Sequence, residues 1–185
     1  MEPLTYLEII QTLAKLKDVM RHSWTSEGRQ ESVAEHSWRM GMMVYFLKDS
    51  FPQMNLEKAL ILTMIHDLGE IFTGDIPVFE KESTHEQKEN DMLHEYLNSL
   101  PAPYRTELLA LTAEYEAQET LEAKVVKAVD KLEVIDQHNL APLQTWIPLE
   151  YELNLTHGQK QCAFNDMLES IRQEIVNQTK RKTGL

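Results

Sequence analysis

The chain has 185 residues, a formal net charge of −12 at pH 7 and 42% hydrophobic residues, which fits one domain with a sizeable core. The acidic balance and the lack of a long basic stripe disfavour duplex DNA or RNA as a partner. A single Cys162, no apolar run of membrane-span length and a start at Met1 without a secretory pattern predict a cytoplasmic protein.

Helices are expected nearly throughout, because proline and glycine are few and no stretch alternates polar and apolar residues long enough for a sheet. The first helix should begin after Thr5. Ser32 to Glu35 matches a capping box, which predicts a second helix reaching about Lys48. Asn55 is a candidate cap for a third helix, which should end near Gly69.

The second half of the chain continues the helical pattern. Glycine and proline bracket Thr73 to Pro77, which predicts a loop there. Four more helices are expected: from Ser83, where Ser-Thr-His-Glu matches another capping box, to about Ser99; after Pro101 and Pro103 to about Gln118; from Thr120 to about His138; and from near Gly158 to about Lys180. With no linker or repeat, the prediction is an all-α fold in a single domain over residues 1–185.

Four potential metal ligands, His36, His66, Asp67 and Asp130, fall where helical spacing places them on buried faces of three expected helices. A lone inward histidine is more often a hydrogen-bonded core residue than a ligand, and Asp130 alone could pair with a lysine or an arginine. Without a metal, each of the four buried polar groups would need its own hydrogen-bond or ion-pair partner. One divalent cation would serve as the partner of all four at once. The pattern therefore favours a metal site.

The types of ligand limit the choice of metal. Imidazole and carboxylate without thiolate suit Mn, Fe, Co, Ni or Zn better than Cu(I), and histidine argues against Ca. Four protein ligands would leave positions on a six-coordinate ion for water and a substrate oxygen, which is the arrangement that hydrolysis needs.

Three further residues are candidates for the chemistry. Glu70 lies one helical turn beyond the ligand pair, where it could take a proton from water, and Asp75 could give a proton to a leaving oxygen. Arg21 could hold a phosphate through two parallel hydrogen bonds. The ordinary interpretations are a glutamate at a helix end, an aspartate in a turn and a solvated arginine.

The order His36, His66-Asp67, Asp130 resembles the H…HD…D signature of the HD-domain metal phosphohydrolases. The resemblance extends to the small HD 5′-nucleotidases, the YfbR-type group, over four blocks: Ser32 to Ser37, His66 to Glu70, Thr73 to Pro77 and Ala128 to Glu133. It covers about residues 13–151 and weakens afterwards, which separates a metal-site core from a C-terminal helix at about 158–180.

The resemblance implies a helical HD fold, commonly a homodimer, and hydrolysis of nucleoside 5′-monophosphates, often deoxyribonucleotides, to nucleoside and phosphate. It adds Mg to the possible ions. Carried onto this chain, it implies one divalent ion on His36, His66, Asp67 and Asp130, catalysis by Glu70 and Asp75, and phosphate binding by Arg21, whose local block is a looser match.

Other functions stay open at this stage. One is a different HD phosphohydrolase, acting on nucleoside triphosphates or phosphodiesters; another is a non-catalytic nucleotide-binding HD module. Some HD proteins hold further metals on extra histidines between the HD pair and the last aspartate. His85 and His94 lie in that interval, but in a charged, solvated-looking segment, which favours one ion. Trp24 could stack on a base, although a core tryptophan is the ordinary interpretation.

Overall fold

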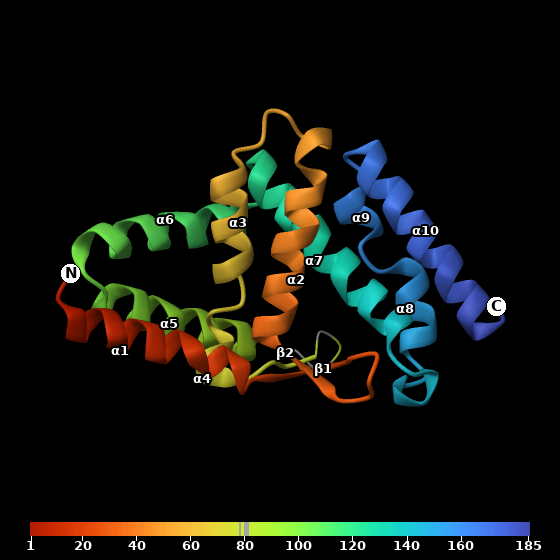
Figure 1. Ribbon diagram of the computed structural model, residues 1–185, viewed down its shortest axis with the longest axis horizontal. Helices are drawn as coiled ribbons and strands as arrows, with labels where there is room; N and C mark the ends of the chain where they lie inside the picture. Colours follow the sequence, from red (N-terminus) through yellow and green to blue (C-terminus); the bar gives the residue numbers. More distant parts are fainter. Residues whose placement is uncertain (78, 80–81) are drawn as a thin grey trace.

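The computed structural model describes residues 1–77, 79 and 82–185, and helices dominate these residues (Figure 1). This confirms the all-α class. The α-helices are α1 (Pro3–Leu13), α2 (Val33–Leu47), α3 (Leu56–Ile65), α4 (Glu70–Thr73), α5 (Ser83–Ser99), α6 (Ala102–Ala117), α7 (Leu121–Leu140), α8 (Glu150–Thr156), α9 (Gln159–Cys162) and α10 (Asp166–Thr183); 3-10 turns cover Ala14–Lys17, Lys48–Ser50 and Leu143–Thr145, and two strands are β1 (Met20–Trp24) and β2 (Gln30–Ser32).

A small antiparallel hairpin of β1 and β2 interrupts the helices in the first third of the chain. Met20 pairs with Ser32, and the connecting turn contains Gly28 at a φ of 76°. The expectation of a chain without a sheet was wrong here, because strands of five and three residues are too short for alternation to stand out. The hairpin matters because it turns Arg21 inward.

Helix starts were predicted well where a side chain caps the first turn. Ser32 accepts a hydrogen bond from the backbone N–H of Glu35, and the Glu35 carboxylate accepts one from the Ser32 N–H, which completes the capping box of α2. Asn55 caps α3, and Thr120 caps α7. These three caps fix the starts of the three helices around the site.

Three helix boundaries differ from the prediction. Helix α1 begins at Pro3 rather than after Thr5. Helix α3 ends at Ile65 rather than near Gly69, because the chain turns through residues 66–69 before the short α4 begins. The cap of α5 is Glu82, whose backbone N–H donates to the ring of His85 at 3.2 Å, and Ser83 is the first helical residue.

The expected single C-terminal helix is two helices. Helix α9 ends at Cys162, and α10 begins only after Asn165, whose side chain accepts hydrogen bonds from the backbone N–H groups of Met167 and Leu168. An asparagine side chain that hydrogen-bonds to nearby backbone groups disfavours a helix interior and favours a helix start. Asn165 therefore begins a new helix within an apolar pattern that looked continuous in the sequence.

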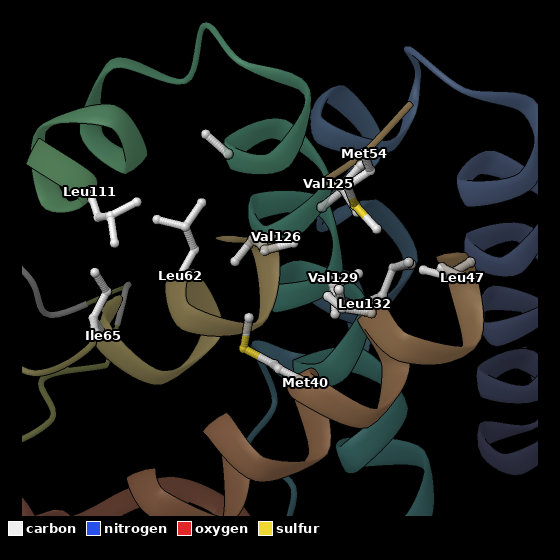
Figure 2. Packing of buried hydrophobic residues seen from close by; sticks show 14 of the residues in the cluster. Met40, Leu47, Met54, Leu62, Ile65, Leu111, Val125, Val126, Val129 and Leu132 are labelled. Carbon is white, nitrogen blue, oxygen red and sulfur yellow. The ribbon is translucent and has the colours of Figure 1, made fainter. Parts of the chain in front are cut away.

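Helix α7 forms the centre of the molecule and packs against α2, α3, α6 and α10 (Figure 1). Figure 2 shows Met40 of α2, Leu62 of α3 and Val126 and Val129 of α7 meeting in the core, where none of the four is exposed to solvent. Dense packing of this kind holds the three helices in fixed positions relative to one another. Within the described residues, no helix is long and apolar enough to cross a membrane.

Candidate functional site

The predicted ligands come together where α2, the turn after α3 and α7 meet. His36 Nε2 lies 3.8 Å from Asp67 Oδ2, and His66 Nε2 lies 3.0 Å from the same oxygen. Each of these three residues offers one ligand atom, and the three atoms lie within 4.8 Å of one another. This spacing lets one cation contact all three side chains.

Both histidines present a buried ring nitrogen to this point without a hydrogen-bond partner among the described residues. His66 Nδ1 lies 3.0 Å from the carbonyl oxygen of Thr63, and His36 Nδ1 lies 2.6 Å from a carboxylate oxygen of Glu133. Because these oxygens accept, each Nδ1 donates, and a neutral ring then directs a lone pair from Nε2. Two such lone pairs beside the Asp67 carboxylate fit a metal ion.

Asp130 lies at the edge of this group. One carboxylate oxygen is 3.6 Å from His36 Nε2, and the other is 3.0 Å from Lys131 Nζ and 3.4 Å from Lys127 Nζ. Burial raises the pKa of Asp130, but the two lysines and His36 outweigh burial and hold the pKa well below its usual value. Asp130 therefore forms ion pairs with two lysines and also lies close to His36.

Glu133 supports the site from behind and was not singled out from the sequence. It is fully buried, and its second carboxylate oxygen accepts a hydrogen bond from Arg39 at 3.0 Å. Burial and Arg21 lower the pKa of His36, but Glu133 and Asp130 outweigh them and raise the pKa to about 9, so a cation that binds at Nε2 takes the place of a proton there. Glu133 lies one turn after Asp130 on the same buried face of α7, and this spacing is the signal that could have identified it in the sequence.

Arg21 is buried rather than solvated, with 9% of its surface exposed. Its guanidinium lies 3.5 Å from Asp67 and 3.5 Å from Glu31, a buried glutamate of β2. Burial lowers the pKa of Arg21, but Asp67 and Asp75 outweigh it and raise the pKa above its ordinary value. Burial and the charge of Glu133 raise the pKa of Glu31 to about 7.

Glu70 is also buried, at 6% exposure, so it is not a surface residue at a helix end. Its Oε2 has no hydrogen-bond partner among the described residues. Burial and the charges of Asp67 and Asp75 raise the pKa of Glu70 to about 10. Asp75, half-buried in the loop after α4, accepts a hydrogen bond from the backbone N–H of His22 at 3.3 Å.

A cleft of about 250 Å³ opens next to these groups. His36 is buried behind it, and His66 lines a second cavity. Charged residues of both signs line one end of the cleft, apolar residues form a wall, and a second set of polar residues lines the rest. Its lining includes Arg21, Asp67, Glu70, Asp75, Lys127, Asp130 and Lys131, then Ile76, Pro77, Phe79, Val134 and Ile135, and then His22, His138, Glu150 and Asn154.

The remaining candidates lie elsewhere. His94 is exposed on α5, and His85 caps that helix. Trp24 is half-buried, and its carbonyl oxygen accepts a hydrogen bond from Gln137 at 2.6 Å. None of these three is among the described residues that line the cleft.

Comparison with known proteins places this geometry in context. Residues 13–172 match the family model described as "HD domain". A human protein named 5′-deoxynucleotidase HDDC2 is 35% identical over 136 residues, which cover 71% of this chain and 65% of that protein. A Schizosaccharomyces pombe protein named 5′-deoxynucleotidase hdd1 is 33% identical over 142 residues, with coverage of 72% and 71%. The match thus spans just under two thirds of the human relative.

Solved structures share the fold. A "predicted metal-dependent phosphohydrolase" from Magnetospirillum magnetotacticum has a TM-score of 0.82 at 24% identity, covering 98% of this chain and 97% of that one. A conserved hypothetical protein from Pyrococcus furiosus has a TM-score of 0.63 at 30% identity, with coverage of 95% and 99%. An HD phosphohydrolase from cyanophage S-2L, bound to dA and one catalytic Zn²⁺, has a TM-score of 0.59 at 19% identity, with coverage of 93% and 94%.

Proposed function

Because this chain belongs to the HD-domain family, we propose that it is a metal-dependent phosphomonoesterase that hydrolyses nucleoside 5′-monophosphates, deoxyribonucleotides among them, to nucleoside and phosphate. One observation carries the proposal: the unpartnered Nε2 atoms of His36 and His66 converge beside Asp67, at the charged end of a cleft. The names of the curated relatives, 5′-deoxynucleotidase, support the substrate class.

The proposed cofactor is one divalent ion, held by His36, His66, Asp67 and Asp130. The donor set of two imidazoles and two carboxylates suits Mn, Fe, Co, Ni, Zn or Mg, and the Zn²⁺ of the cyanophage protein supports this range. When bound, such an ion lowers the pKa of a water, neutralises phosphate charge and favours the ionised form of a neighbouring carboxyl group.

The protein's own residues then have distinct tasks. Glu70 points an unpartnered carboxyl oxygen into the cleft from the start of α4, where it takes the proton of the attacking water. Asp75, on the neighbouring loop, assists the departure of the 5′-oxygen. Arg21 is oriented by Glu31 and Asp67 and offers its guanidinium to the phosphoryl oxygens as charge develops on them.

Two rival functions differ in what they would release or require. An HD phosphohydrolase acting on nucleoside triphosphates or phosphodiesters would yield pyrophosphate, triphosphate or a nucleotide instead of phosphate. A non-catalytic nucleotide-binding module would have no use for a buried carboxyl group such as Glu70 beside its ligands, because keeping that group away from water costs free energy.

We further propose that two copies of the chain associate through the outer face of α2, defined by Trp38, Met42, Tyr45 and Phe46. These residues are 70%, 40%, 40% and 76% exposed and recur at helical spacing. Large exposed apolar side chains that share one face are typical of interfaces, whereas scattered ones need no explanation.

The test is phosphate release from a panel of nucleoside 5′-monophosphates by purified protein with added Mn²⁺ or Co²⁺. We expect metal-dependent release, loss of release in Asp67→Asn, and normal release in the matched variant Asp91→Asn on the exposed face of α5. No release from any monophosphate would reject the proposal. Pyrophosphate or triphosphate from nucleoside triphosphates, without phosphate from monophosphates, would favour the first rival.

A further inference from the structure

The cleft extends well beyond the proposed metal ligands. Helix α7 lines it from Asp130 to His138, and eight residues of helix rise ~12 Å. At the far end Glu150 of α8 contacts both His138 and His22 of β1. A phosphate at the Arg21 end therefore leaves the length of the cleft for the rest of a nucleotide.

Glu150 is held firmly at this far end. It is 2% exposed, and its Oε2 accepts a hydrogen bond from the backbone N–H of Ile147 at 2.8 Å. Its Oε1 lies 3.1 Å from His22 Nε2 and 3.2 Å from His138 Nε2. One carboxylate oxygen is thus satisfied by the backbone, while the other is directed at two imidazoles.

The neighbours of His138 fix which of its nitrogens carries the proton. Asn154 donates through Nδ2 to the carbonyl oxygen of Ile135 at 2.9 Å and to the hydroxyl of Thr179 at 3.1 Å. Its Oδ1 therefore faces His138 Nδ1, at 2.8 Å, and accepts the hydrogen of that nitrogen. Burial lowers the pKa of His138, which favours the neutral ring.

A neutral His138 with its hydrogen on Nδ1 leaves a lone pair on Nε2, facing Glu150 Oε1. Two acceptors then stand 3.2 Å apart in the wall of the cleft. Such a pair is stabilised by a ligand that brings a hydrogen to donate. In the described part of the chain, His22, His138 and Glu150 do not form a group of three ligand atoms within 4.8 Å of one another, so a hydrogen-bond donor fits this end of the cleft better than a metal ion.

We propose that Glu150 and His138 bind a hydrogen-bond donor on the nucleoside of the substrate, either a sugar hydroxyl or a base amino group. This inference rests on the proposed function, because the phosphate sets the direction in which the nucleotide lies. His22 holds the carboxylate from the other side, with its ring packed edge-on against Phe79 at 5.5 Å. Phe79 and Pro77 provide apolar surface beside the nucleoside.

The experiment compares three substrates in the wild-type, metal-loaded protein: 2′-deoxyadenosine 5′-monophosphate, its 2′,3′-dideoxy analogue, and its analogue without the adenine amino group. We expect one analogue to lose roughly tenfold or more in kcat/KM, mainly through KM, because it leaves His138 Nε2 and Glu150 Oε1 facing each other with no hydrogen between them. A loss with the dideoxy analogue assigns the sugar hydroxyl, and a loss with the other assigns the base. Equal kcat/KM for all three would overturn the inference.

The variant Glu150→Gln keeps the shape of the side chain, but its amide donates to His138 and so takes the place of the substrate's donor. We expect the difference between substrate and analogue to fall to about twofold or less, while Glu152→Gln, exposed on the same helix, keeps the full difference. The same penalty in Glu150→Gln as in wild type would also overturn the inference.

A binding measurement separates this inference from the proposed function. Calorimetric titration with deoxyadenosine, which has no phosphate, should show binding to wild type and Glu152→Gln and at least tenfold weaker binding to Glu150→Gln. Binding with this pattern but no hydrolysis of any monophosphate would reject the function and keep the nucleoside site. Hydrolysis with equal nucleoside binding by all three proteins would keep the function and reject the site.

Discussion

The Nδ1 atom of His36 lies 2.6 Å from the carboxylate of Glu133, and neither residue is exposed to solvent. The carboxylate fixes the ring so that Nε2 faces Asp67 and Asp130. Glu133 is therefore a positioning residue for a proposed ligand. We predict that Glu133→Gln lowers metal affinity about 10- to 100-fold, measured by calorimetric titration of the metal-free protein with Zn²⁺ or Mn²⁺.

The control for this prediction is Asp136→Asn on the same helix, which removes a different carboxylate partner of Arg39. It should leave metal affinity within about twofold. Unchanged metal affinity in Glu133→Gln, with helical content intact by circular dichroism, would contradict the positioning role.

Asp67 and Glu70 should separate metal binding from chemistry. Asp67 touches both histidines, so Asp67→Ala should lose the metal. Glu70 faces the cleft without belonging to the ligand group, so Glu70→Gln should keep the metal and lose about 10²- to 10⁴-fold in kcat. Metal content by atomic emission and single-turnover rates measure the two effects. A Glu70→Gln protein with wild-type kcat would remove Glu70 from the mechanism.

Arg21→Lys tests the phosphate contact. Lysine keeps the charge but cannot offer two parallel donors, and its shorter reach disturbs the contacts to Glu31 and Asp67. We expect kcat/KM to fall at least about tenfold, with metal affinity less affected. The matched change Arg29→Lys, on an exposed arginine of the same hairpin, should leave kcat/KM unchanged. If both variants behaved alike, Arg21 would have no part in binding the phosphate.

The starts of the helices around the site were predictable because capping is local. Ser32, Asn55 and Thr120 each accept a hydrogen bond from the backbone N–H three residues later, so the signal lies within a few positions. The placement of His36 and Asp130 on buried faces followed from helical spacing for the same reason.

The surroundings of the site were not predictable in this way. Glu31 lies on a three-residue strand, and Glu150 lies on a seven-residue helix after an irregular segment; neither has a repeating pattern around it. The contact between His36 and Glu133 joins residues 97 positions apart, and only the packing of α2 against α7 brings them together. Burial of Arg21 likewise depends on a hairpin too short to recognise.

The proposed association of two copies predicts a change in mass. Phe46→Glu places a charge at the most exposed position on the outer face of α2, and desolvating that charge would oppose association. We expect light scattering to give twice the chain mass for wild type and the single-chain mass for the variant. Met167→Glu, at 46% exposure on α10, should not change the wild-type result. A monomeric wild type at micromolar concentration would reject the proposal.

His157 should make stability depend on pH. Burial, reinforced by the charge of Lys131, lowers the pKa of its ring to about 4 in the folded chain, against an ordinary value of 6.5. As pH falls from 6.5 towards 4, the unfolded chain takes up a proton that the folded chain does not. The free energy of unfolding therefore decreases over this window and is unaffected by His157 above pH 6.5. Replacing His157 by a residue that does not titrate removes its contribution to the pH dependence of stability, while the other groups titrate as before. In urea unfolding of metal-free protein at pH 7.5 and pH 5, the loss of unfolding free energy should be smaller by about 1 kcal/mol in His157→Gln than in wild type. An identical loss in the two proteins would mean that the ring is protonated as easily inside the folded protein as outside it.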